Sequence, residues 1–507
     1  MVLLRILPSR ESHPLHGIER SRAHERQAQA ALPEHTLMQR AGLATARLAR
    51  AIAPHAQRVW IAAGPGNNGG DGLEAAMHLA HRGVSVTLSL LAEPARLPAD
   101  AARSLARARA AGVAIDAALP AADALHGFDL AIDALLGIGA SRAPEGVLAA
   151  AIELFNRCRG PRLAIDMPSG LHAQTGQPLG AMTVRATHTL SLLTLKPGLF
   201  TGAARDCVGE VWFDGLDVPS PAGAPDAWLA GANHASARGH DLHKGSFGDL
   251  AIVAGAAGMA GAALLAARAG HAAGAGRVFV QALGASALEL DPMHPELMFR
   301  PGLLDERARA LRLACIACGC GGGSAVHAVL PQVLALPARL VLDADALNAV
   351  AADTALQALL ASRAARGHAT VLTPHPLEAA RLLGITTREV QADRLLAAAR
   401  IAERWRCTVL LKGSGSIVAA PDRVPSINPT GNAALASAGT GDVLAGWLAG
   451  SWAGRAMTDG FDVAVETAWL HGAAAPTSPT GPLRASELIE SMFAQRAAAA
   501  ADSDQPR

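Results

Sequence analysis

Three stretches of this sequence share one pattern, in which a short apolar run is followed by glycine and by acidic residues. They are RVWIAAGPGNNGGDG (58–72), DLAIDALLGIG (129–139) and RLAIDMPSG (162–170). The first is followed by EAAMHLAHRG, which has helical character, and then by another apolar run, VSVTLSLL. Such alternation predicts a parallel, doubly wound sheet in a three-layer α/β/α domain. In these folds ligands bind beyond the carboxyl ends of the strands, so the glycine loops are the expected site.

A stretch rich in Pro, Gly, Ala and Ser (218–240) interrupts this pattern. A second α/β series then begins with DLAIVAG and continues through LVLDADALN, ATVLTPHP and CTVLLKGSGSIVAA, the last of which suggests a hairpin. The interrupting composition is typical of a linker. We therefore predict a first domain over 1–218, a linker over 219–235, a second domain over 236–502 and a disordered tail over 503–507.

The composition of the chain limits the classes of partner that we expect. The 507 residues carry a net charge of +1, which gives no reason to expect nucleic acid or an anionic membrane as a partner. No apolar run reaches the ~18 residues that span a bilayer, and the N-terminus lacks a secretory apolar region and cleavage site. We expect a cytoplasmic protein that forms a homo-oligomer and acts on small molecules.

Lysine is scarce: of 44 lysines and arginines, only Lys196, Lys244 and Lys412 are lysines. Because arginine serves wherever a generic positive charge is needed, the remaining lysines are candidates for positions that require a compact ammonium group. Lys412 begins KGSGS (412–416) after an apolar strand. A lysine followed by glycines and hydroxyls suits a diphosphate, although no Walker A sequence is present.

The stretch NPTGNAALASAGTGDVLAG (428–446) places glycines around Asp442 immediately before an apolar helix. Glycine loops and helix N-termini bind anions through free backbone N–H groups. A carboxylate at such a point is explained if it takes a proton from a hydroxyl during phosphoryl transfer. Asp442 is therefore a candidate catalytic base, and a helix-capping aspartate is the alternative.

The loop GPGNNGG (64–70) fits G-x-G-x-x-G, and Glu93 lies near the end of the next strand, as in nicotinamide-dinucleotide dehydrogenases. Pro65 removes one N–H from such a phosphate cradle. The loop also presents polar side chains that suit substrate hydroxyls or a hard cation: Asn67, Asn68 and Asp71. A plain strand-to-helix turn with a capping aspartate remains the structural alternative.

Asp133 and Asp166 end two strands on the same rim, and Ser169 follows in DMPSG. Together with Asn68, Asp133 and Ser169 offer oxygen ligands with one formal negative charge. Such a set favours potassium over a tightly coordinated divalent ion, and offers nothing to zinc or copper. The alternative is that each aspartate only caps the turn after its strand.

Three further motifs each allow two interpretations. The cysteines of ACIACGCGGG, Cys315, Cys318 and Cys320, suggest buried thiols on a strand, with a metal or redox site as the alternative. His375 stands between two prolines in TPHPLE and either contacts a ligand or is structural. Asp343 in LDADALN is interpreted as forming a turn rather than as catalytic.

These motifs resemble one family, the NAD(P)H-hydrate repair enzymes. GNNGGDG, DALLGIG, AIDMPSG and LKPG resemble its epimerase domain, and HKGSFG, GMAGAALLAARA, LDADALN, TPHP, LKGSGS and NPTGN…GTGD resemble its dehydratase domain. The resemblance implies a Rossmann-like first domain and a ribokinase-like second domain. It implies epimerisation of R- and S-NADHX and NADPHX, the nicotinamide C6 hydrates, and ADP-dependent dehydration of the S epimer to NAD(P)H, AMP and phosphate.

The resemblance also implies roles for individual residues. Asp166 and Asp442 become catalytic, and potassium is bound by Asn68, Asp133 and Ser169. In the first domain the hydrate is held by Asn67, Asn68, Gly69, Gly70, Asp71, Gly137, Ile138, Gly139, Ala140, Ser141, Arg142 and Ala143. In the second domain it is faced by Ala262, Gly321, Gly322 and His375. ADP is bound by Lys412, Gly413, Ser414, Gly415, Ser416 and Gly441, and Mg²⁺ is expected in the same domain.

The chain departs from the family's usual sequence in three loops. It has Leu377 in TPHPLE where the family has glycine, GCGGG instead of GPGLG, and NPTGNAA instead of NPTGNPG. None of these changes removes a polar catalytic group. Two other classes stay open: a ribokinase-type small-molecule kinase fused to a nucleotide-binding domain, and a non-catalytic scaffold, against which the presence of Lys412 and Asp442 argues.

Overall fold

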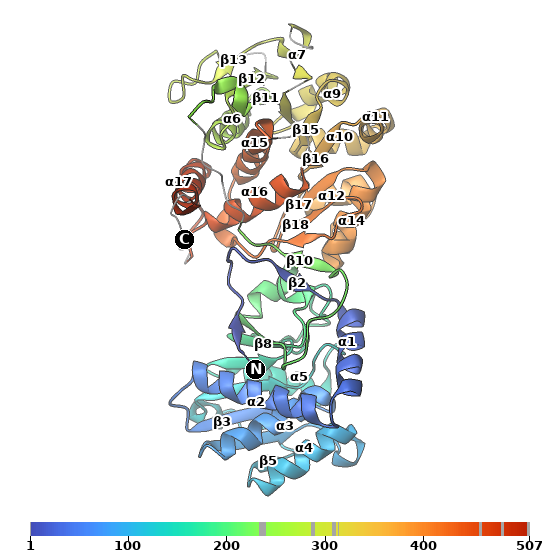
Figure 1. Cartoon of the computed structure of the whole chain (residues 1–507), viewed down its shortest axis with the longest axis vertical. Coiled ribbons are helices and arrows are strands. Elements are labelled where there is room, and N and C mark those ends of the chain that lie inside the picture. Colours follow the sequence, from blue (N-terminus) through green and yellow to red (C-terminus); the bar gives the residue numbers. More distant parts are fainter. Residues whose placement is uncertain are drawn as a thin grey trace. The chain divides into compact units, whose positions relative to one another are not determined.

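The computed structural model describes residues 2–232, 240–284, 289–306, 311–312, 314–455, 459–477 and 481–503. They form two compact units, shown in Figure 1. Unit 1 comprises the residues up to Leu7 and His13–Ala227, and unit 2 comprises Pro8–Ser12 and the residues from Trp228 onward. The division falls within the expected linker, which carries strand β10 (Ala227–Leu229). The expected domain start at 236 and tail residues 504–507 lie outside the described residues, whereas Ser503 ends helix α17.

Unit 1 is built on an eight-stranded sheet with the order β1-β9-β8-β7-β6-β3-β4-β5, in which β1 alone pairs antiparallel to its neighbour. Its strands are β1 (Leu4–Arg5), β3 (Arg58–Ala63), β4 (Ser85–Leu90), β5 (Ala114–Asp116), β6 (Leu130–Ala134), β7 (Arg162–Ile165), β8 (His188–Leu192) and β9 (Glu210–Asp214). A short strand, β2 (His13–Leu15), lies near the N-terminus. The helices are α1 (Ile18–Ala31), α2 (Thr36–Ile52), α3 (Asn67–Ala80), α4 (Ala99–Ala110) and α5 (Gly146–Arg157).

The residues of β3 show why helices cover both faces of this sheet. Alternate strand residues face opposite sides. Ile61 packs in a core with Leu48 of α2, together with residues of α3 and α4. Trp60 packs in a second core with Phe155 of α5. The predicted three-layer α/β/α architecture of the first half is therefore confirmed.

Unit 2 contains a mainly parallel sheet with the order β13-β12-β11-β14-β15-β16-β17-β18-β19-β10. Its further strands are β11 (Asp249–Ala254), β12 (Arg277–Ala282), β13 (Met298–Phe299), β14 (Cys315–Cys318), β15 (Arg339–Leu342), β16 (Ala369–Leu372), β17 (Thr408–Leu411), β18 (Ile417–Ala419) and β19 (Ser426–Ile427). The helices are α6 (Ala260–Ala272), α7 (Leu303–Glu306), α9 (Val326–Ala335), α10 (Ala344–Ala352), α11 (Thr354–Ala365), α12 (Pro376–Leu383), α13 (Thr387–Ala392), α14 (Arg394–Trp405), α15 (Thr440–Ala453), α16 (Phe461–Ala473) and α17 (Ala485–Ser503). The predicted α/β class holds here too, and β17 and β18 form the suggested hairpin.

One predicted boundary was wrong. The polar loop expected over 64–72 is largely the beginning of helix α3, which starts at Asn67 behind Gly66. Glycine allows this because the helix start lies very close to neighbouring backbone: a Cβ on Gly69 would lie 2.1 Å from the carbonyl oxygen of Gly64. The side chains of Asn67 and Asn68 are therefore fixed on a helical turn.

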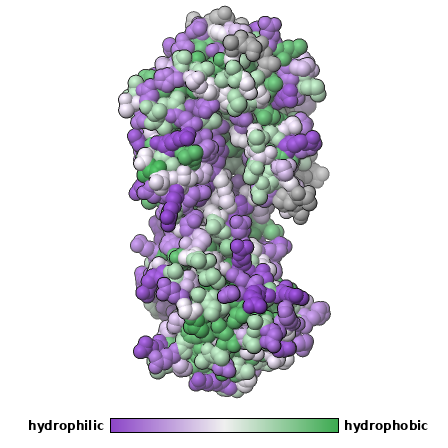
Figure 2. All heavy atoms as spheres, turned by 180° about the vertical axis from the view of Figure 1, so that it is seen from behind, coloured by the Kyte–Doolittle hydropathy of each residue, from purple (hydrophilic) through white to green (hydrophobic). Residues whose placement is uncertain are grey.

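The surface shown in Figure 2 mixes hydrophilic and apolar residues over both units, and apolar residues gather on one part of unit 1. In the described part of the chain, no helix has both the length and the apolar composition needed to cross a membrane.

Helices α6 and α15 lie in backbone contact, and this contact positions the start of α15. A Cβ on Gly446 would lie 2.1 Å from the carbonyl oxygen of Ala266, and one on Gly450 would lie 2.2 Å from that of Gly270. Helix α15 is buried among apolar residues from both its neighbours and the sheet. Its first turn carries Asp442, so glycine at these positions fixes where that carboxylate lies.

We expect Gly446→Ala to lower the free energy of unfolding of the protein by about 1–3 kcal/mol, because the new methyl group must push two helices apart. Gly261→Ala, on α6, is the matched control, since its added Cβ meets nothing within 4 Å. That control should be neutral or stabilising by about 0.4–1 kcal/mol. Denaturant unfolding of both variants tests the packing, and equal stabilities would contradict it.

Candidate functional site

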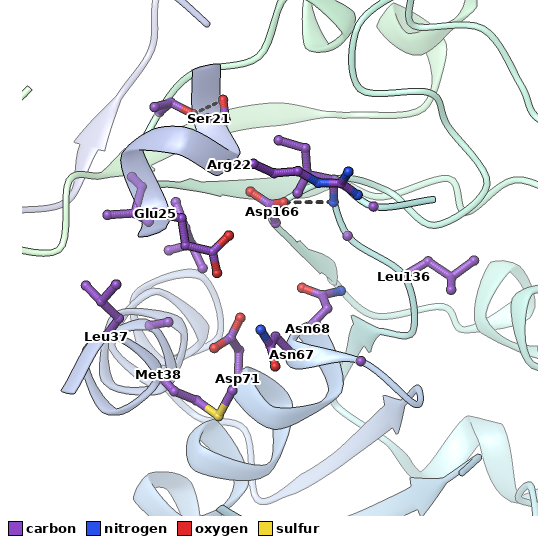
Figure 3. Close-up of a pocket in the computed structure, with 18 of the residues that line it drawn as sticks. Ser21, Arg22, Glu25, Leu37, Met38, Asn67, Asn68, Asp71, Leu136 and Asp166 are labelled. Atoms are coloured by element: carbon purple, nitrogen blue, oxygen red, sulfur yellow. Dashed lines mark hydrogen bonds between the residues drawn. The ribbon is translucent and has the colours of Figure 1, made fainter. Parts of the chain in front are cut away.

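A pocket in unit 1 gathers most of the first domain's predicted site residues, as Figure 3 shows. Its lining includes Asn67, Asn68 and Asp71 from α3, residues 137–140 after β6, and Asp166 after β7. The other predicted residues do not line it. Gly69 and Gly70 pack against backbone and Met38, Ser141 and Arg142 are exposed, and Ala143 packs beside Gly180.

The carboxylate of Asp166 is fixed in this pocket by hydrogen bonds to both of its oxygens. Its Oδ1 accepts a hydrogen bond from Lys196 Nζ, and its Oδ2 accepts one from the backbone N–H of Ile138 at 3.1 Å. The backbone of Asp166 is left-handed, with φ of 67°, a conformation that is uncommon outside glycine and is often found at functional sites. Lys196 is only 2% exposed and also donates to the carbonyl of Leu192 at 2.8 Å. The scarcity of lysine thus marked a site residue.

The predicted potassium ligands lie at the base of the same loops. Ser169 donates to Asp133 Oδ1 through its hydroxyl at 2.7 Å and to Oδ2 through its backbone N–H at 2.8 Å. Ser169 Oγ also accepts from the N–H of Leu136 at 2.9 Å. The Asn68 side chain is buried, and among the described residues neither its oxygen nor its nitrogen has a hydrogen-bond partner. Burial raises the pKa of Asp133 to about 6, although these hydrogen bonds oppose the increase.

Sequence reasoning missed the contribution of α1. Ser21, Arg22 and Glu25 line the pocket, and Glu25 is directed into it. No motif marks them, because α1 is polar on most of its surface. Conversely, Glu93, the residue that a dehydrogenase fingerprint requires, is exposed and pairs with Arg96 rather than lining this pocket.

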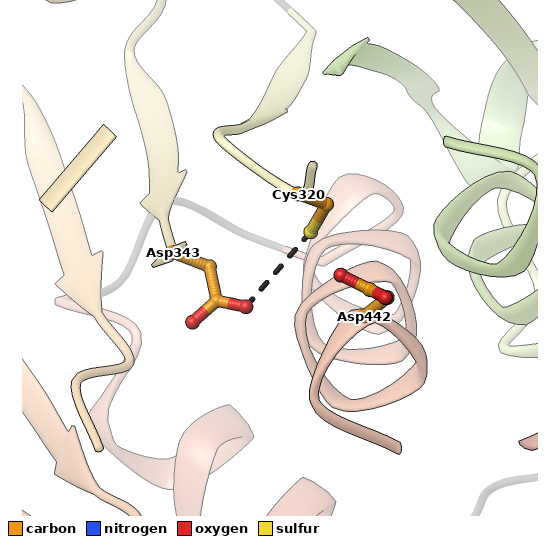
Figure 4. Close-up of side chains that lie close together, drawn as sticks. All are labelled: Cys320, Asp343 and Asp442. Atoms are coloured by element: carbon orange, nitrogen blue, oxygen red, sulfur yellow. Dashed lines mark hydrogen bonds between the residues drawn. The ribbon is translucent and has the colours of Figure 1, made fainter. Parts of the chain in front are cut away.

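The second site lies where β14, β15 and α15 meet in unit 2. Figure 4 shows the side chains of Cys320, Asp343 and Asp442 directed toward one another, and their ligand atoms lie within 4.8 Å of each other. Lys412, after β17, donates to Asp343 Oδ1 at 2.6 Å. Thr373 donates to the same oxygen at 2.8 Å. Asp343 lies in the turn between β15 and α10, as expected, but its side chain makes no capping bond and pairs with Lys412.

The pKa values of Asp442, Glu378 and Lys412 in this site are all raised. Burial raises the pKa of Asp442 to about 6, and the nearby Asp343 adds to the increase. Burial also raises the pKa of Glu378 to about 7. For Lys412 burial acts to lower the pKa, but the carboxylates of Asp343 and Glu378 outweigh it and the pKa is raised. Asp442 therefore changes charge close to neutral pH, as a proton acceptor must.

The other predicted residues of unit 2 surround this cluster. Gly441 lies one residue before Asp442, and a Cβ there would meet Lys412 Nζ at 3.6 Å. A Cβ on Gly321 would lie 2.9 Å from that of Ala262, and one on Gly322 would meet Val326. Residues 413–416 form the turn between β17 and β18, with positive φ at Gly413 and Gly415.

His375 caps α12 and lies 3.2 Å from Glu378, a neighbour that the sequence did not indicate. All six cysteines are buried and free, which confirms them as buried thiols. Cys320 Sγ lies 3.9 Å from Asp343 Oδ2, and burial raises its pKa well above the usual value.

Removing the cation of the Lys412–Asp343 pair should be costly. We expect Lys412→Met to destabilise the protein by about 3–5 kcal/mol, because it leaves a buried carboxylate unpaired. The double variant Lys412→Met, Asp343→Asn should recover much of that loss. Arg406→Met is the control: its ion pairs with Glu403 and Asp422 are exposed, so the cost should stay below about 1 kcal/mol. Urea unfolding of these proteins and of the single variant Asp343→Asn measures the coupling, and an additive double variant would contradict it.

Both halves of the chain match known protein families. Residues 34–198 match the family described as YjeF-related protein N-terminus, and residues 250–492 match the family described as NAD(P)H-hydrate dehydratase. The bifunctional NAD(P)H-hydrate repair enzyme Nnr of Escherichia coli is 37% identical over 87% of this chain and 84% of its own length. The enzyme of the same name from Moorella thermoacetica is 36% identical over 87% and 88%.

Solved structures also resemble the chain in part. The ADP/ATP-dependent NAD(P)H-hydrate dehydratase from Bacillus subtilis is 27% identical, with a TM-score of 0.42 over 52% of this chain and 94% of its own length. The relatives that match along most of the sequence identify the group to which the chain is related. The chain belongs to the family of bifunctional NAD(P)H-hydrate repair enzymes.

Proposed function

We propose that this chain repairs hydrated NADH and NADPH in two steps. Unit 1 interconverts the R and S epimers of the C6 hydrate, and unit 2 dehydrates the S epimer with ADP, releasing NAD(P)H, AMP and phosphate. The observation that carries the proposal is the cluster of unit 2, where Asp442 stands in the first turn of α15 beside the Lys412–Asp343 pair. This cluster suits the transfer of a phosphoryl group to a hydroxyl. Homo-oligomerisation stays a prediction.

In unit 2, Lys412 and the turn 413–416 suit the diphosphate of ADP, because an ammonium group, a glycine-rich backbone and the N-terminus of α15 all favour negative charge. Asp442 takes the proton of the C6 hydroxyl as its oxygen attacks the β-phosphorus of ADP, and AMP departs. The C6–O bond then breaks, and phosphate leaves with its electron pair. Loss of the neighbouring ring proton restores the double bond.

Magnesium fits this site. Asp343 and Asp442 offer the carboxylate oxygens that Mg²⁺ prefers, and their ligand atoms lie within 4.8 Å of one another. When bound there, Mg²⁺ would neutralise charge on the ADP phosphates.

In unit 1, Asp166 and the loops over Asn67–Asp71 and 137–140 suit the nicotinamide end of the hydrate. A potassium ion also fits beneath them. The buried Asn68 amide has no hydrogen-bond partner, and the neighbouring loops supply the carboxylate of Asp133 and the hydroxyl of Ser169. Oxygen ligands with one formal charge suit a weakly held monovalent cation. Such an ion would fix the loops that carry Asp166.

The function is tested by adding hydrated NADH and ADP to the purified protein and following the return of NADH absorbance. Starting from the S epimer tests unit 2, and starting from the R epimer tests both units together. NADH formation that requires ADP, with AMP and phosphate as products, is the expected result. Phosphorylation of a stable alcohol without NADH formation would support the kinase alternative instead.

Asp442→Asn should lower the rate of dehydration of S-NADHX by ~10²–10⁴-fold, because the amide cannot accept the hydroxyl proton. In the unchanged protein the carboxylate form is needed, and the pKa of Asp442 is about 6. The rate should therefore fall as the pH is lowered through this pKa, which a bound Mg²⁺ would move below 6. Epimerisation by the same variant is the control for folding. Near-normal dehydration by Asp442→Asn would remove the proposed role.

Potassium should accelerate epimerisation relative to choline at equal ionic strength, and Asn68→Ala should abolish that difference. Asn68 is the best position to change, because its side chain makes no hydrogen bond whose loss would disturb the loops. Dehydration of S-NADHX serves as the control reaction. Equal epimerisation by the unchanged protein in potassium and choline salts would rule out the cation.

A further inference from the structure

Helix α1 forms one wall of the unit 1 pocket, and it precedes residue 34, where the family match begins. Ser21, Arg22 and Glu25 face the pocket from this helix. Figure 3 shows the Glu25 carboxylate directed into the same space as those of Asp166 and Asp71. Glu25 has no role in the function proposed for unit 1.

The wall is held firmly in place. At its start, Asp226 accepts hydrogen bonds from the backbone N–H of Gly17 at 2.8 Å and from Arg20 Nε at 2.7 Å. One turn later, Ser21 Oγ lies 2.7 Å from Thr194 Oγ1, two residues before Lys196. Near its end, Ala28 is buried in the core with α2. Glu25 thus projects from a fixed helical turn between these anchors.

The surroundings of Glu25 suit a carboxyl group that exchanges a proton. Burial and the nearby Asp166 raise its pKa, while three cations oppose that increase. Gln29 Nε2 donates to Glu25 Oε1 at 3.5 Å. The charged groups that face it come from α1 itself, from α3, and from the loops after β7 and β8: Arg22, Arg26, Asp71, Asp166 and Lys196.

One carboxylate alone cannot carry out the proton transfers that epimerisation at C6 requires. The hydroxyl must leave one face of the ring as water, which needs a proton. Water must then add to the other face, which needs a proton acceptor. Between the two steps the positive charge is shared by C6 and the ring nitrogen. General acid and base groups are therefore required from two sides of the substrate.

We propose that Glu25 is the second acid–base residue of epimerisation, acting from the α1 wall while Asp166 acts from the end of β7. This role rests on the proposed function of unit 1. With Glu25 protonated, its proton goes to the C6 hydroxyl and the C–O bond breaks to release water. Asp166 then accepts a proton from the water that adds to C6. In the reverse direction the two carboxyls exchange roles, so atoms and charge balance.

Asp71 is the competing candidate, and its environment suits a different task. Burial, together with Asp166 and Glu25, raises the pKa of Asp71 well above the usual value. A carboxyl held protonated in this way serves as a hydrogen-bond donor rather than as a group that gains and loses a proton in each cycle. For Glu25, by contrast, three nearby cations oppose the increase in pKa, which makes it the better candidate to give up a proton.

The test compares Glu25→Gln, Glu25→Asp and Glu19→Gln in the full chain. Glu19→Gln is the matched control, the same change on an exposed residue of the same helix that does not line the pocket. Conversion of R-NADHX is measured in the presence of ADP, and dehydration of S-NADHX is measured separately to show that unit 2 is intact. We expect Glu25→Gln to lower kcat for epimerisation by ~10²–10⁴-fold.

Glu25→Asp should keep part of the activity, and Glu19→Gln all of it. The unchanged protein should lose epimerisation as the pH rises past the pKa of Glu25, and the residual rate of Glu25→Gln should lack that pH dependence. Epimerisation by Glu25→Gln within about threefold of normal, or a change in KM alone with the pH profile kept, would overturn this role. An unchanged protein that does not epimerise at all would instead overturn the function proposed for unit 1, and this role with it.

Discussion

Each of the two sites depends on a lysine, buried in unit 1 and partly buried in unit 2, that is paired with a strand-end carboxylate. Lys196 pairs with Asp166 in unit 1, and Lys412 pairs with Asp343 in unit 2. Each pair joins segments that are far apart in the sequence and thereby fixes a loop. Asp166 also accepts a hydrogen bond from the backbone N–H of Ile138. Lys412 stands at the beginning of the turn between β17 and β18. A buried charge is tolerated only with its partner, so these pairs strongly favour one arrangement of the loops.

Local patterns were sufficient to predict much of this protein. The strand 58–63 was predicted with the bounds that β3 has, because an apolar run before glycine is a short-range signal. The polar residues after β6 and β7 could be placed on one rim, because parallel strands end at the same edge of a sheet. Scarcity of lysine marked Lys196 and Lys412, since a chain that uses arginine elsewhere keeps lysine where a small ammonium group is required.

The residues that were missed owe their roles to contacts between distant segments. Glu25 lies on a helix that is polar on most of its surface, so no periodicity shows which side faces the pocket. Asp343 stands at the start of α10, where an aspartate usually caps the helix, but its partners Lys412 and Thr373 come from other segments of the chain. Glu378 had the same ambiguity, because it does complete a capping box with His375 while lying 3.9 Å from Lys412.

Both sites contain more carboxylates than their lysine can neutralise. In unit 1, Glu25 and Asp71 accompany the Lys196–Asp166 pair, and in unit 2, Asp442 and Glu378 accompany the Lys412–Asp343 pair. Burial raises the pKa of each of these four additional carboxyls, to about 6 for Asp442 and about 7 for Glu378. In unit 2, Asp442 and Glu378 therefore hold protons close to neutral pH beside the paired carboxylate of Asp343. Removing and returning a hydroxyl on a nicotinamide ring consists largely of proton transfers, and this division between paired and proton-bearing carboxyls provides for them.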